Sequence, residues 1–483
     1  MSLSGERIAI VGGGMSGLVA AFYLTRSGGS REVTLFDAAG RVGGVIRTER
    51  VDGYLLEHGA DMFATQPDAA LRLCEDLGIS QRLISPQPGM RGAALVDRGR
   101  LVRIPDGFVL MRPTRWWPMV TTPLLSWRGK WRLLAERNVP PRPEGQDDES
   151  IESFVTRRLG RELLDRIVQP LVGGIYVGDV AKLSMAATMG QFLQMERESG
   201  SLWAATLRRR KEGIDTTERN SAGARYEQFR SFPGGLQELL DALQRSLPPQ
   251  RLRLGVRVTS IDRSGGGWRL AGEAVSGVGQ NSQGSALGEF DHVIVATPAK
   301  LAARLLEGPA PDAAALLGSI EAASSAIVAL GVRESDISRP TDVAGFVVPV
   351  REGRPILAAS FTSDKFAGRA PQGEKLIRVF FGGALQPELL GKSNDELVRI
   401  AREQMAELIG LGGTPTLVRV IRWDEAMPQY HVGHKGLVKR IEQAVAGHPG
   451  LHVIGNSLGG VGIAPTVAAA AAVARRIDGG PRG

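Results

Sequence analysis

The chain has 483 residues, of which 43% are hydrophobic and 23% charged, and its formal net charge is +8. This composition excludes a wholly disordered, collagen-like or mainly membrane-spanning chain. The length allows about three average domains or one large α/β unit with insertions. A positive charge suits nucleic acid, anionic lipid or an acidic substrate, so its position along the chain must decide between them.

A strand, a helix and a second strand are predicted at the start of the chain. Residues 7–11 form a β-branched run typical of a parallel strand that is buried on both faces. Residues 15–29 have helical periodicity, and residues 32–37 form a second strand that ends on Asp37. Together they predict a β-α-β unit.

A glycine fingerprint lies inside this unit. Gly12, Gly14 and Gly17 follow the first strand in G-x-G-x-x-G spacing, and Asp37 ends the second strand. In such units the helix amides hold a pyrophosphate, while the carboxylate binds ribose hydroxyls. The combination predicts a dinucleotide site.

A second glycine pair, Gly43 and Gly44, follows just past the acid. Ordinary NAD dehydrogenases are not expected to have this extension, so it favours FAD. Residues 453–472 repeat the order of strand, glycine loop and helix near the end of the chain. The N-terminus of that helix would stabilise the negative charge that develops on a reduced flavin ring.

The single cysteine, Cys74, lies in a segment with helical periodicity and is predicted to be a buried core thiol. One cysteine forms no intrachain disulfide, and the first residues have no signal-peptide pattern. Both observations predict a reducing, cytoplasmic compartment.

Tryptophans and cations gather in residues 98–137. They are Trp116, Trp117, Trp127 and Trp131, among Arg112, Arg115, Arg128, Lys130 and Arg132. This pattern is typical of a protein that lies on a membrane, and no run reaches the roughly eighteen apolar residues that a span requires. An internal amphipathic core is the alternative. The segment lacks an accompanying nucleic-acid-binding fold, so no nucleic-acid partner is predicted.

Two polar stretches, residues 138–150 and 208–225, are predicted to be surface linkers or loops on either side of a mostly helical segment. Residues 251–299 include several strands, and four strand-like runs within residues 324–383 predict a second, more antiparallel sheet. Residues 394–410 form a good amphipathic helix.

His431 and His434 have H-x-x-H spacing, but no cysteine or patterned carboxylate completes a ligand set. No metal site is predicted.

The glycine-rich stretches resemble the FAD-binding halves of the monoamine oxidase and phytoene desaturase superfamily. Within it, four further motifs resemble the protoporphyrinogen oxidase family: "IYVGDVAKLSM" (175–185), "SFPGGLQEL" (231–239), "MPQYHVGH" (427–434) and "GNSLGGVGI" (455–463). The resemblance runs nearly from end to end, and the two polar stretches are its least similar parts.

This resemblance implies an α/β fold with a Rossmann-like FAD-binding domain of the monoamine oxidase type, a mixed-sheet substrate domain and a mostly helical membrane-binding insertion. The expected FAD-binding parts are residues 1–90, 226–300 and 415–483, the insertion is 91–225, and the substrate-binding sheet domain is 301–414.

The resemblance also implies an FAD-dependent enzyme that oxidises protoporphyrinogen IX to protoporphyrin IX in haem biosynthesis. Hydride would pass to FAD in successive rounds, and O2 would reoxidise the flavin and form hydrogen peroxide. The enzyme would be cytoplasmic, with peripheral contact to the inner face of the cell membrane through residues 98–137, and a homodimer is compatible with the family.

Residues that match the family's positions are expected to bind FAD. They are Gly12, Gly14, Met15, Ser16, Gly17, Asp37, Ala38, Arg41, Gly43, Gly44, Val256, Val258, Trp423, Gly455, Asn456, Val461, Gly462 and Ile463. Val256 or Val258 would offer backbone to adenine, with Trp423 nearby, and the last five residues would border the isoalloxazine.

Five further residues are expected to bind the porphyrinogen. Gly174 matches a glycine that lines the family's pocket, Val347 stands where a leucine is usual, and Phe380 matches an aromatic that packs on a pyrrole ring. Asp61 is a polar anchor, and Arg91 is the candidate for a propionate, although counting back from the following proline places the matching position nearer Ala93. No general acid or base is predicted.

Other functions remain open at this point. The enzyme alternatives are oxidation of coproporphyrinogen III to coproporphyrin III, amine oxidation and carotenoid desaturation. A non-enzymatic alternative is a regulator of the same fold that binds prenylated proteins, which would not need the "GNSLGGVGI" loop.

Overall fold

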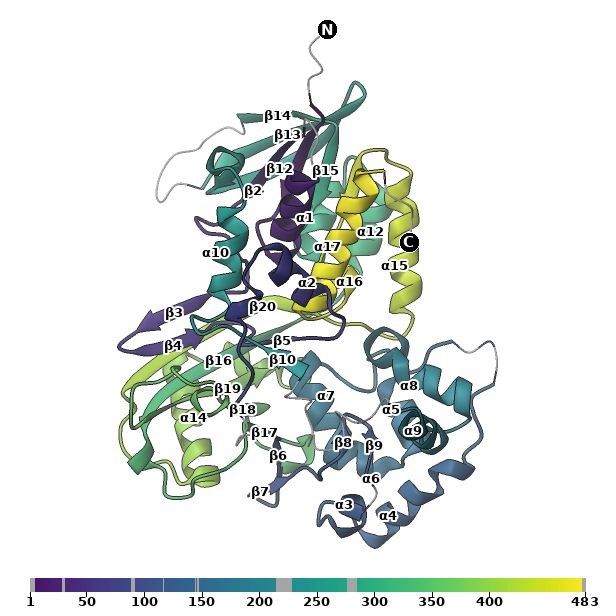
Figure 1. The fold of residues 1–483 in the computed structure, drawn as a ribbon, viewed down its shortest axis with the longest axis vertical. Coiled ribbons are helices and arrows are strands. Elements are labelled where there is room, and N and C mark those ends of the chain that lie inside the picture. Colours follow the sequence, from purple (N-terminus) through teal and green to yellow (C-terminus); the bar gives the residue numbers. More distant parts are fainter. Residues whose placement is uncertain are drawn as a thin grey trace.

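The computed structural model of the protein describes residues 5–27, 31–87, 92–115, 117–143, 145, 147–213, 228–275 and 285–479. Arg91 and Trp116, which the sequence singled out, lie outside the described residues. Figure 1 shows a sheet with its surrounding helices in the upper part, a second large sheet at the lower left and a group of helices at the lower right.

Five parallel strands form the sheet of the upper part, in the order β11-β2-β1-β15-β21. They are β1 (Arg7–Val11), β2 (Glu32–Asp37), β11 (Leu252–Leu254), β15 (His292–Val295) and β21 (Leu451–Val453). Along β1, Ile8 and Ile10 enter the core on one face of the sheet, while Ala9 and Val11 enter the core on the other. The predicted β-α-β unit and its buried first strand are confirmed.

Helices and a small sheet cover the two faces of this parallel sheet. One face carries α1 (Met15–Arg26), α2 (Ala69–Asp76), α10 (Gln237–Arg245) and α17 (Ile463–Ile477). The other carries α11 (Ala299–Leu306), α12 (Pro311–Gly318), α15 (His434–Ala446) and the sheet β12 (Val256–Ser264), β13 (Gly267–Ala274) and β14 (Ser285–Phe290). Coverage on both faces explains why the parallel strands read as continuous apolar runs.

The second large sheet has seven strands in the order β20-β16-β19-β18-β17-β6-β7. They are β6 (Ala94–Asp97), β7 (Arg100–Arg103), β16 (Ala322–Arg333), β17 (Gly345–Val347), β18 (Ala358–Phe361), β19 (Glu374–Gly382) and β20 (Leu417–Pro428). All neighbouring pairs are antiparallel except β17 with β6. One face packs on α14 (Asn394–Ile409). The predicted second, more antiparallel sheet and its amphipathic helix are therefore confirmed.

Three short pairs of strands complete the described strands. They are β3 (Thr48–Val51) with β4 (Tyr54–Glu57), β5 (Phe63–Ala64) with β10 (Phe229–Arg230), and β8 (Phe108–Val109) with β9 (Arg112–Pro113).

The helices at the lower right of Figure 1, residues 117–211, are called the helical insertion below. They are α3 (Trp117–Thr121), α4 (Trp127–Leu134), α5 (Ile151–Arg158), α6 (Arg161–Leu163), α7 (Gln169–Tyr176), α8 (Met185–Ser199) and α9 (Leu202–Lys211), with a π-helical turn at Leu164–Val168. They share one apolar core. The polar stretch expected from residue 208 instead begins as the last turn of α9, and residues 214–227 lie outside the described part.

Three segments pack across the domain boundaries expected from the sequence. β6 and β7 lie within 91–225 but pair into the seven-stranded sheet, and β20 lies within 415–483 but joins the same sheet. α11 and α12, mostly within 301–414, pack on the parallel sheet. In each case the apolar face of the segment is buried by an element that is distant along the chain.

A buried ion pair holds the helical insertion together. Arg158 has no exposed side-chain surface and pairs with Glu136 and, at 3.2 Å, with Glu196. Its guanidinium also donates to the carbonyls of Val139 at 2.8 Å and Gly200 at 3.1 Å. One side chain thus connects three segments of the insertion, namely α5, residues 136–139 and residues 196–200.

Replacing Arg158 by methionine is expected to destabilise the protein by about 3–5 kcal/mol, because Glu136 would stay buried without its cation and Glu196 would keep only Arg157. Urea unfolding followed by circular dichroism measures the loss. The matched control is Arg161→Met, since Arg161 forms ion pairs on the same insertion with a side chain that is 62% exposed, and it should cost no more than about 1 kcal/mol. Equal losses from the two variants would contradict the structural role of Arg158.

Candidate cofactor and substrate site

The first glycine loop brings α1 very close to β1. A Cβ atom on Gly17 would lie 1.9 Å from the carbonyl oxygen of Gly12, so no larger residue fits without moving the helix. Gly12 has a φ of +113°, and a Cβ there would lie 2.6 Å from the carbonyl oxygen of Ala296 at the end of β15. The two glycines therefore hold the start of α1 against the carboxyl edge of the sheet, as the fingerprint predicts.

Asp37 is fixed by backbone groups on either side of it. One carboxylate oxygen accepts from the amide of Gly13 at 2.6 Å, and the other accepts from the amide of Ala39 at 2.7 Å. Each oxygen keeps a further acceptor position. The carboxylate thus stands beside the glycine loop with capacity for ribose hydroxyls.

The second glycine pair packs directly on the first loop. The amide of Gly43 donates to the carbonyl of Gly13 at 2.7 Å, and a Cβ on Gly44 would lie 3.4 Å from the Cα of Gly14. Around Gly14 itself a Cβ would meet nothing within 4 Å. The two glycine segments are therefore one layer of backbone with an open side at Gly14.

Arg41 holds the backbone of the second glycine segment through hydrogen bonds to its carbonyls. Its guanidinium donates to the carbonyl of Gly44 at 2.7 Å and to those of Val42 and Ile46 at 3.1 Å each. Burial lowers the pKa of Arg41, but an arginine keeps its charge at any physiological pH. Arg41 therefore places a positive charge beside the loop while it holds the backbone of the loop.

Three helices begin at this edge of the sheet without a side-chain cap. The residues before α1, α11 and α17 are Gly14, Pro298 and Gly462, and none of them caps its helix with a side chain. The first amides of a helix need acceptors and carry partial positive charge. Met15 and Ser16 in α1, and Ile463 in α17, supply such amides. A ligand with a diphosphate at one end and an electron-accepting ring at the other suits this edge.

Thr297 is a residue that the sequence reasoning missed. It follows β15, and its methyl group would lie 3.4 Å from a Cβ on Gly12, while its carbonyl oxygen would lie 3.6 Å from a Cβ on Gly455. Its hydroxyl oxygen is buried and has no hydrogen-bond partner among the described residues. A buried polar atom of this kind needs a partner, so Thr297 fits a dinucleotide that passes between the two glycine loops.

Val256 and Val258, expected near adenine, follow a backbone hydrogen bond that joins their strand to the segment after Asp37. The amide of Gly255, just before Val256, donates to the carbonyl of Ala39 at 2.9 Å. Val258 follows on β12. The start of β12 is thus beside the segment Asp37 to Ala39, where the adenosine end of a dinucleotide would lie.

Trp423, expected beside the adenine end of FAD, is not on the small sheet that carries Val256 and Val258. It is on β20 of the seven-stranded sheet, its indole donates to the carbonyl of His58 at 2.8 Å, and it packs in the apolar cluster that includes Phe380. Trp423 therefore stands where the seven-stranded sheet meets the FAD-binding part, because β20 pairs with β16 and not with the small sheet that carries Val256.

A row of apolar side chains crosses the face of the seven-stranded sheet opposite α14. Directly paired residues of neighbouring strands place their side chains on the same face. The row is Leu95, Val347, Ala358, Phe380, Ile327 and Ile421. The structure therefore brings Val347 and Phe380, each expected from the family resemblance, to one face.

Gly174 of α7 lies over this face. A Cβ on Gly174 would lie 3.1 Å from a side-chain methyl of Val347. A cavity of about 70 Å³ lies at the seam, with Gly173, Gly174 and Leu357 in its lining. Gly174, Val347 and Phe380 thus line one region between the helical insertion and the sheet.

Asp61 belongs to a buried charge cluster that the sequence did not reveal. Its carboxylate forms an ion pair with Lys365 of α13 (Thr362–Lys365), and the guanidinium of Arg378 lies 3.6 Å away. Burial alone would raise the pKa of Asp61, but the two cations outweigh it and lower that pKa. Burial lowers the pKa of Lys365. Asp61 is therefore an ionised partner of Lys365.

Arg378 connects this cluster to the apolar row. It lies two residues before Phe380 on β19, so both side chains are on the same face, and its guanidinium stands 5.2 Å from the centre of the Phe380 ring. It also donates to the carbonyl of Gly59 at 2.5 Å. Its Nε finds no partner among the described residues. The cluster thus places positive charge beside the predicted pyrrole contact.

Glu57 is a second buried carboxyl near these cations. It accepts from the amide of Leu236 and the hydroxyl of Thr48, both at 2.8 Å. Burial raises its pKa to about 7, against the opposing effects of these hydrogen bonds and of Arg369 and Arg378. Glu57 therefore holds a proton in the folded protein at mildly acidic pH.

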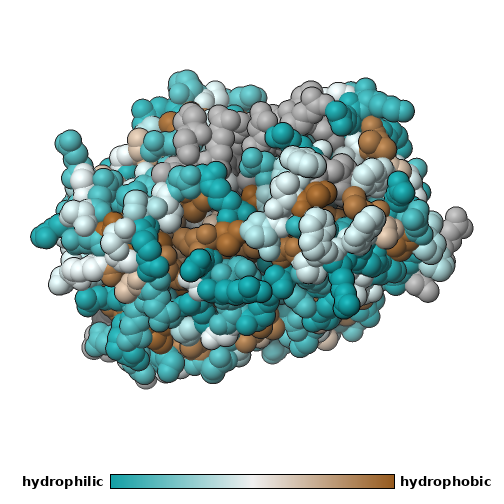
Figure 2. Space-filling model, turned by 90° about the horizontal axis from the view of Figure 1, so that it is seen from below, coloured by the Kyte–Doolittle hydropathy of each residue, from teal (hydrophilic) through white to brown (hydrophobic). Residues whose placement is uncertain are grey.

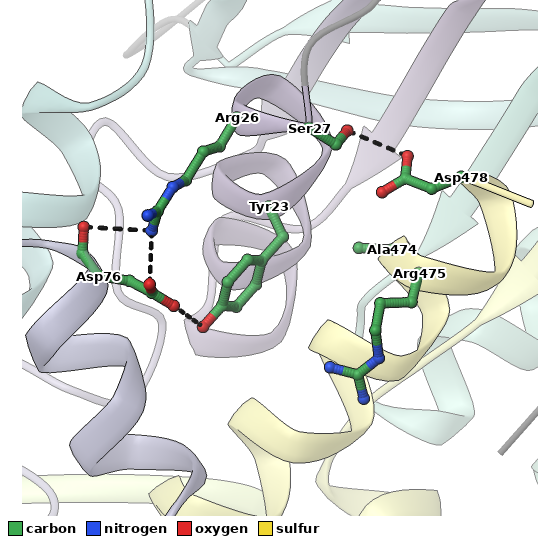
Figure 3. Close-up of a pocket in the computed structure, with 7 residues that line it drawn as sticks. All are labelled: Tyr23, Arg26, Ser27, Asp76, Ala474, Arg475 and Asp478. Atoms are coloured by element: carbon green, nitrogen blue, oxygen red, sulfur yellow. Dashed lines mark hydrogen bonds and ion pairs between the residues drawn. The ribbon is translucent and has the colours of Figure 1, made fainter. Parts of the chain in front are cut away.

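A second cavity lies at the other end of the helices α1 and α17 (Figure 3). It has a volume of about 280 Å³ and lies between the C-terminal ends of α1 and α17. Its charges are largely paired, since Asp76 binds Tyr23 and Arg26, and Asp478 binds Ser27. Because the glycine loops are at the opposite ends of both helices, this cavity is separate from the cofactor edge.

The two histidines of the H-x-x-H motif have different neighbours. His431 lies 3.9 Å from Glu321, whereas His434 bonds the carbonyl of Ser457 at 3.0 Å. Within the described part of the chain, no group of three or more histidine, cysteine or acidic residues is arranged to hold a metal ion.

Comparisons with known proteins agree with this architecture. The family of flavin-containing amine oxidoreductases matches residues 15–478. A coproporphyrinogen III oxidase of Bacillus subtilis is 34% identical and aligns over 96% of each chain. The chloroplastic protoporphyrinogen oxidase of Nicotiana tabacum is 30% identical over 97% of this chain and 85% of that one.

A solved structure covers the whole arrangement. A protoporphyrinogen oxidase-like protein from Exiguobacterium sp. 255-15 superposes with a TM-score of 0.84 and 28% identity, over 99% of both chains. The likeness extends to the parallel sheet, the seven-stranded sheet and the helical insertion together.

Replacing Glu57 by glutamine should flatten the pH dependence of stability between pH 4.5 and about 7. The pKa of Glu57 rises from an ordinary 4.5 to about 7 on folding. The resulting stabilisation is complete below pH 4.5 and is lost as the pH rises through 7. The wild-type protein should lose about 2–3 kcal/mol more than Glu57→Gln across this window, measured by urea unfolding at several pH values.

The control for this experiment is Glu289→Gln. Ser264 and Arg269 lower the pKa of Glu289, so its titration lies below the window. Wild type and Glu289→Gln should have parallel pH profiles. If the stability of Glu57→Gln depended on pH in the same way as that of the other two proteins, Glu57 would not be protonated in the folded state.

Proposed function

The chain belongs to the family of flavin-containing amine oxidoreductases, and from this premise we propose that it oxidises a porphyrinogen to the corresponding porphyrin in haem biosynthesis. It is an FAD-dependent oxidoreductase. The single observation that carries the proposal is the apolar row of the seven-stranded sheet, which Gly174 of the helical insertion approaches at Val347. Relatives that align over nearly the full chain are named for the oxidation of porphyrinogens.

The residues of the chain bind and orient, while bound FAD supplies the electron-accepting chemistry. Gly12, Gly14 and Gly17 would hold the diphosphate, and Asp37 the ribose. The segment from Gly455 to Ile463 would border the ring. Phe380 and Val347 would hold the macrocycle against the sheet, and Gly174 leaves the space for it on the opposite side. Burial of both partners between sheet and insertion would exclude water.

We propose coproporphyrinogen III as the preferred substrate. The motifs alone favoured protoporphyrinogen IX, with coproporphyrinogen III as the alternative. The coproporphyrinogen III oxidases of five bacteria are 29–34% identical to this chain, compared with 26–30% for the plant protoporphyrinogen oxidases. Coproporphyrinogen carries more propionates than protoporphyrinogen does, and the positive Arg378 beside Phe380 is compatible with the more anionic molecule.

Oxygen is the proposed electron acceptor, with hydrogen peroxide as its product. Assembly into a homodimer remains a prediction from the family resemblance.

A membrane-contacting surface is proposed on the helical insertion. Trp117, Trp127 and Trp131 have 75%, 71% and 70% of their surface exposed, which is unusual for so large an apolar side chain. The ammonium of Lys130 lies 4.9 Å from the centre of the Trp127 ring. Figure 2 shows the underside of the molecule, where pale and apolar side chains lie in a band between hydrophilic ones. Exposed tryptophan beside cations favours the interface of an anionic bilayer.

None of the helices in the described ranges is long and apolar enough to cross a membrane. The proposed contact is therefore peripheral.

The purified protein should be yellow, and anaerobic coproporphyrinogen III should bleach the flavin absorbance. Protoporphyrinogen IX should bleach it more slowly, whereas benzylamine and phytoene should not, because neither fills a site shaped for a tetrapyrrole. Stopped-flow absorbance measures the rates, and admission of air should restore the colour with formation of peroxide. A colourless protein that binds no added FAD, or a flavin that neither porphyrinogen reduces, would contradict the proposed function.

Replacing Trp117, Trp127 and Trp131 together by serine should abolish sedimentation with vesicles that contain anionic lipid. The expected loss is about tenfold or more, since interfacial tryptophans contribute through buried apolar area and ring position. Leu301→Ser is the control, because Leu301 is 45% exposed on α11, outside the insertion. Binding that persists in the triple variant would place the membrane contact elsewhere.

A further inference from the structure

A short segment that follows β20 and ends on the first residue of α15, residues 429–434, connects the helical insertion to the glycine loop near the C-terminus. We call it the strap. On the side of the insertion, the carbonyl of Tyr430 accepts from the amide of Ser184 at 2.7 Å, and the amide of Val432 donates to the carbonyl of Lys182 at 2.9 Å. The side chain of Gln429 donates to the carbonyl of Tyr176 at 3.1 Å. The strap therefore bonds to both α7 and the start of α8.

Asp148 joins the strap to the insertion through a carboxylate. Its oxygens accept from the amide of Gly433 at 2.8 Å, from the hydroxyl of Ser184 at 2.7 Å and from the amide of Ala186 at 3.0 Å. Hydrogen bonds to an ionised acceptor are stronger than neutral ones. One residue thus holds the start of α8 and the strap together.

On its other side the strap holds the backbone of the C-terminal glycine loop. The hydroxyl of Tyr430 donates to the carbonyl of Asn456, and Nε2 of His434 bonds the carbonyl of Ser457 at 3.0 Å. The two rings stack with their centres 4.3 Å apart and an angle of 20° between their planes. Both side chains are buried, with 2% and 6% of their surface exposed.

Both groups are donors in their neutral forms. Burial raises the pKa of Tyr430 and lowers that of His434, so at neutral pH the phenol keeps its proton and the imidazole is uncharged. A neutral imidazole has one N–H. Since the Ser457 carbonyl only accepts, that proton is on Nε2.

We propose that Tyr430 and His434 are positioning residues for the flavin, and that the strap transmits the position of the helical insertion to the flavin-facing loop. A peptide unit is planar and trans, so a carbonyl held toward the strap fixes the direction of the N–H in the same unit. The carbonyls of Asn456 and Ser457 are held in this way. Their peptide units lie between Gly455 and Gly462, which would border the ring of bound FAD.

The cost of losing one donor sets the size of the expected effect. A buried carbonyl without its donor is unfavourable by an amount that corresponds to about a five- to tenfold change in an equilibrium constant. The glycines on both sides of the loop offer little resistance to movement, so the loop would shift rather than remain in place. The inference rests on the flavin site and not on which substrate is oxidised.

The first experiment compares two buried tyrosines in the full-length holoprotein. Tyr430→Phe removes only the hydroxyl that holds Asn456, whereas Tyr54→Phe removes a hydroxyl on β4 that bonds Thr416, just before β20, at 2.7 Å. Tyr430→Phe should weaken FAD binding about five- to tenfold and alter the visible circular dichroism of the flavin. Tyr54→Phe should change neither. Equal behaviour of the two variants would overturn the role of Tyr430.

The second experiment tests His434 by conservative rescue. His434→Gln keeps an amide donor, whereas His434→Leu keeps only bulk. Glutamine should retain more FAD and a more native flavin spectrum than leucine, at similar thermal stability. If both variants lose the same amount of FAD, His434 acts by packing and the proposed hydrogen bond is overturned.

The third experiment tests transmission through the strap. Asp148→Ala removes the hydrogen bonds that the carboxylate accepts from Gly433 and Ser184, and Asp148 itself does not contact the glycine loop. The flavin circular dichroism and the rate of photochemical flavin reduction, which needs no porphyrinogen, should both change. Arg161→Ala, also on the insertion, should leave them unaltered. A native flavin signal in Asp148→Ala would overturn the coupling, whatever substrate the enzyme prefers.

Discussion

The close approach of α1 to β1 is the constraint on which the rest of the site depends. Gly17 lets the helix lie against the Gly12 carbonyl, and this contact places the uncapped start of α1 at the carboxyl edge of the parallel sheet. The same loop receives the amide of Gly43, so the second glycine segment is set by the first. The carboxylate of Asp37 accepts a hydrogen bond from the Gly13 amide. A side chain at Gly17 would therefore disturb more than one contact.

The substrate region follows from two sheets that meet at one edge. The loop from Glu57 to Asp61 leaves the FAD-binding part and is held by Arg378 of β19 and Lys365 of α13. Trp423 bonds the same loop through His58. The helical insertion closes the region from a third side, where Gly174 approaches Val347. Charge, aromatic and backbone contacts thus converge where cofactor and macrocycle would meet.

Much of the fold could be predicted because its signals are local. The β-α-β unit, the strands within 324–383 and the helix α14 all have the periodicity of the structures that they form. The first glycine loop and Asp37 were found for the same reason. Lys365 was missed because it pairs with Asp61 across about three hundred residues, and no local pattern marks such a partner. Trp423 was assigned to the adenine end, although β20 belongs to the other sheet. The domain boundaries also follow pairings that are distant along the chain.

The buried charge cluster has a consequence for how such a protein can be divided. Asp61 comes from the first FAD-binding segment, whereas Lys365 and Arg378 come from the sheet domain. A chimera that exchanged either piece alone with a relative would leave a charge buried without its counterpart. The cofactor half and the substrate half are therefore not interchangeable modules, and a recombined or redesigned chain must carry these three positions as one inherited unit.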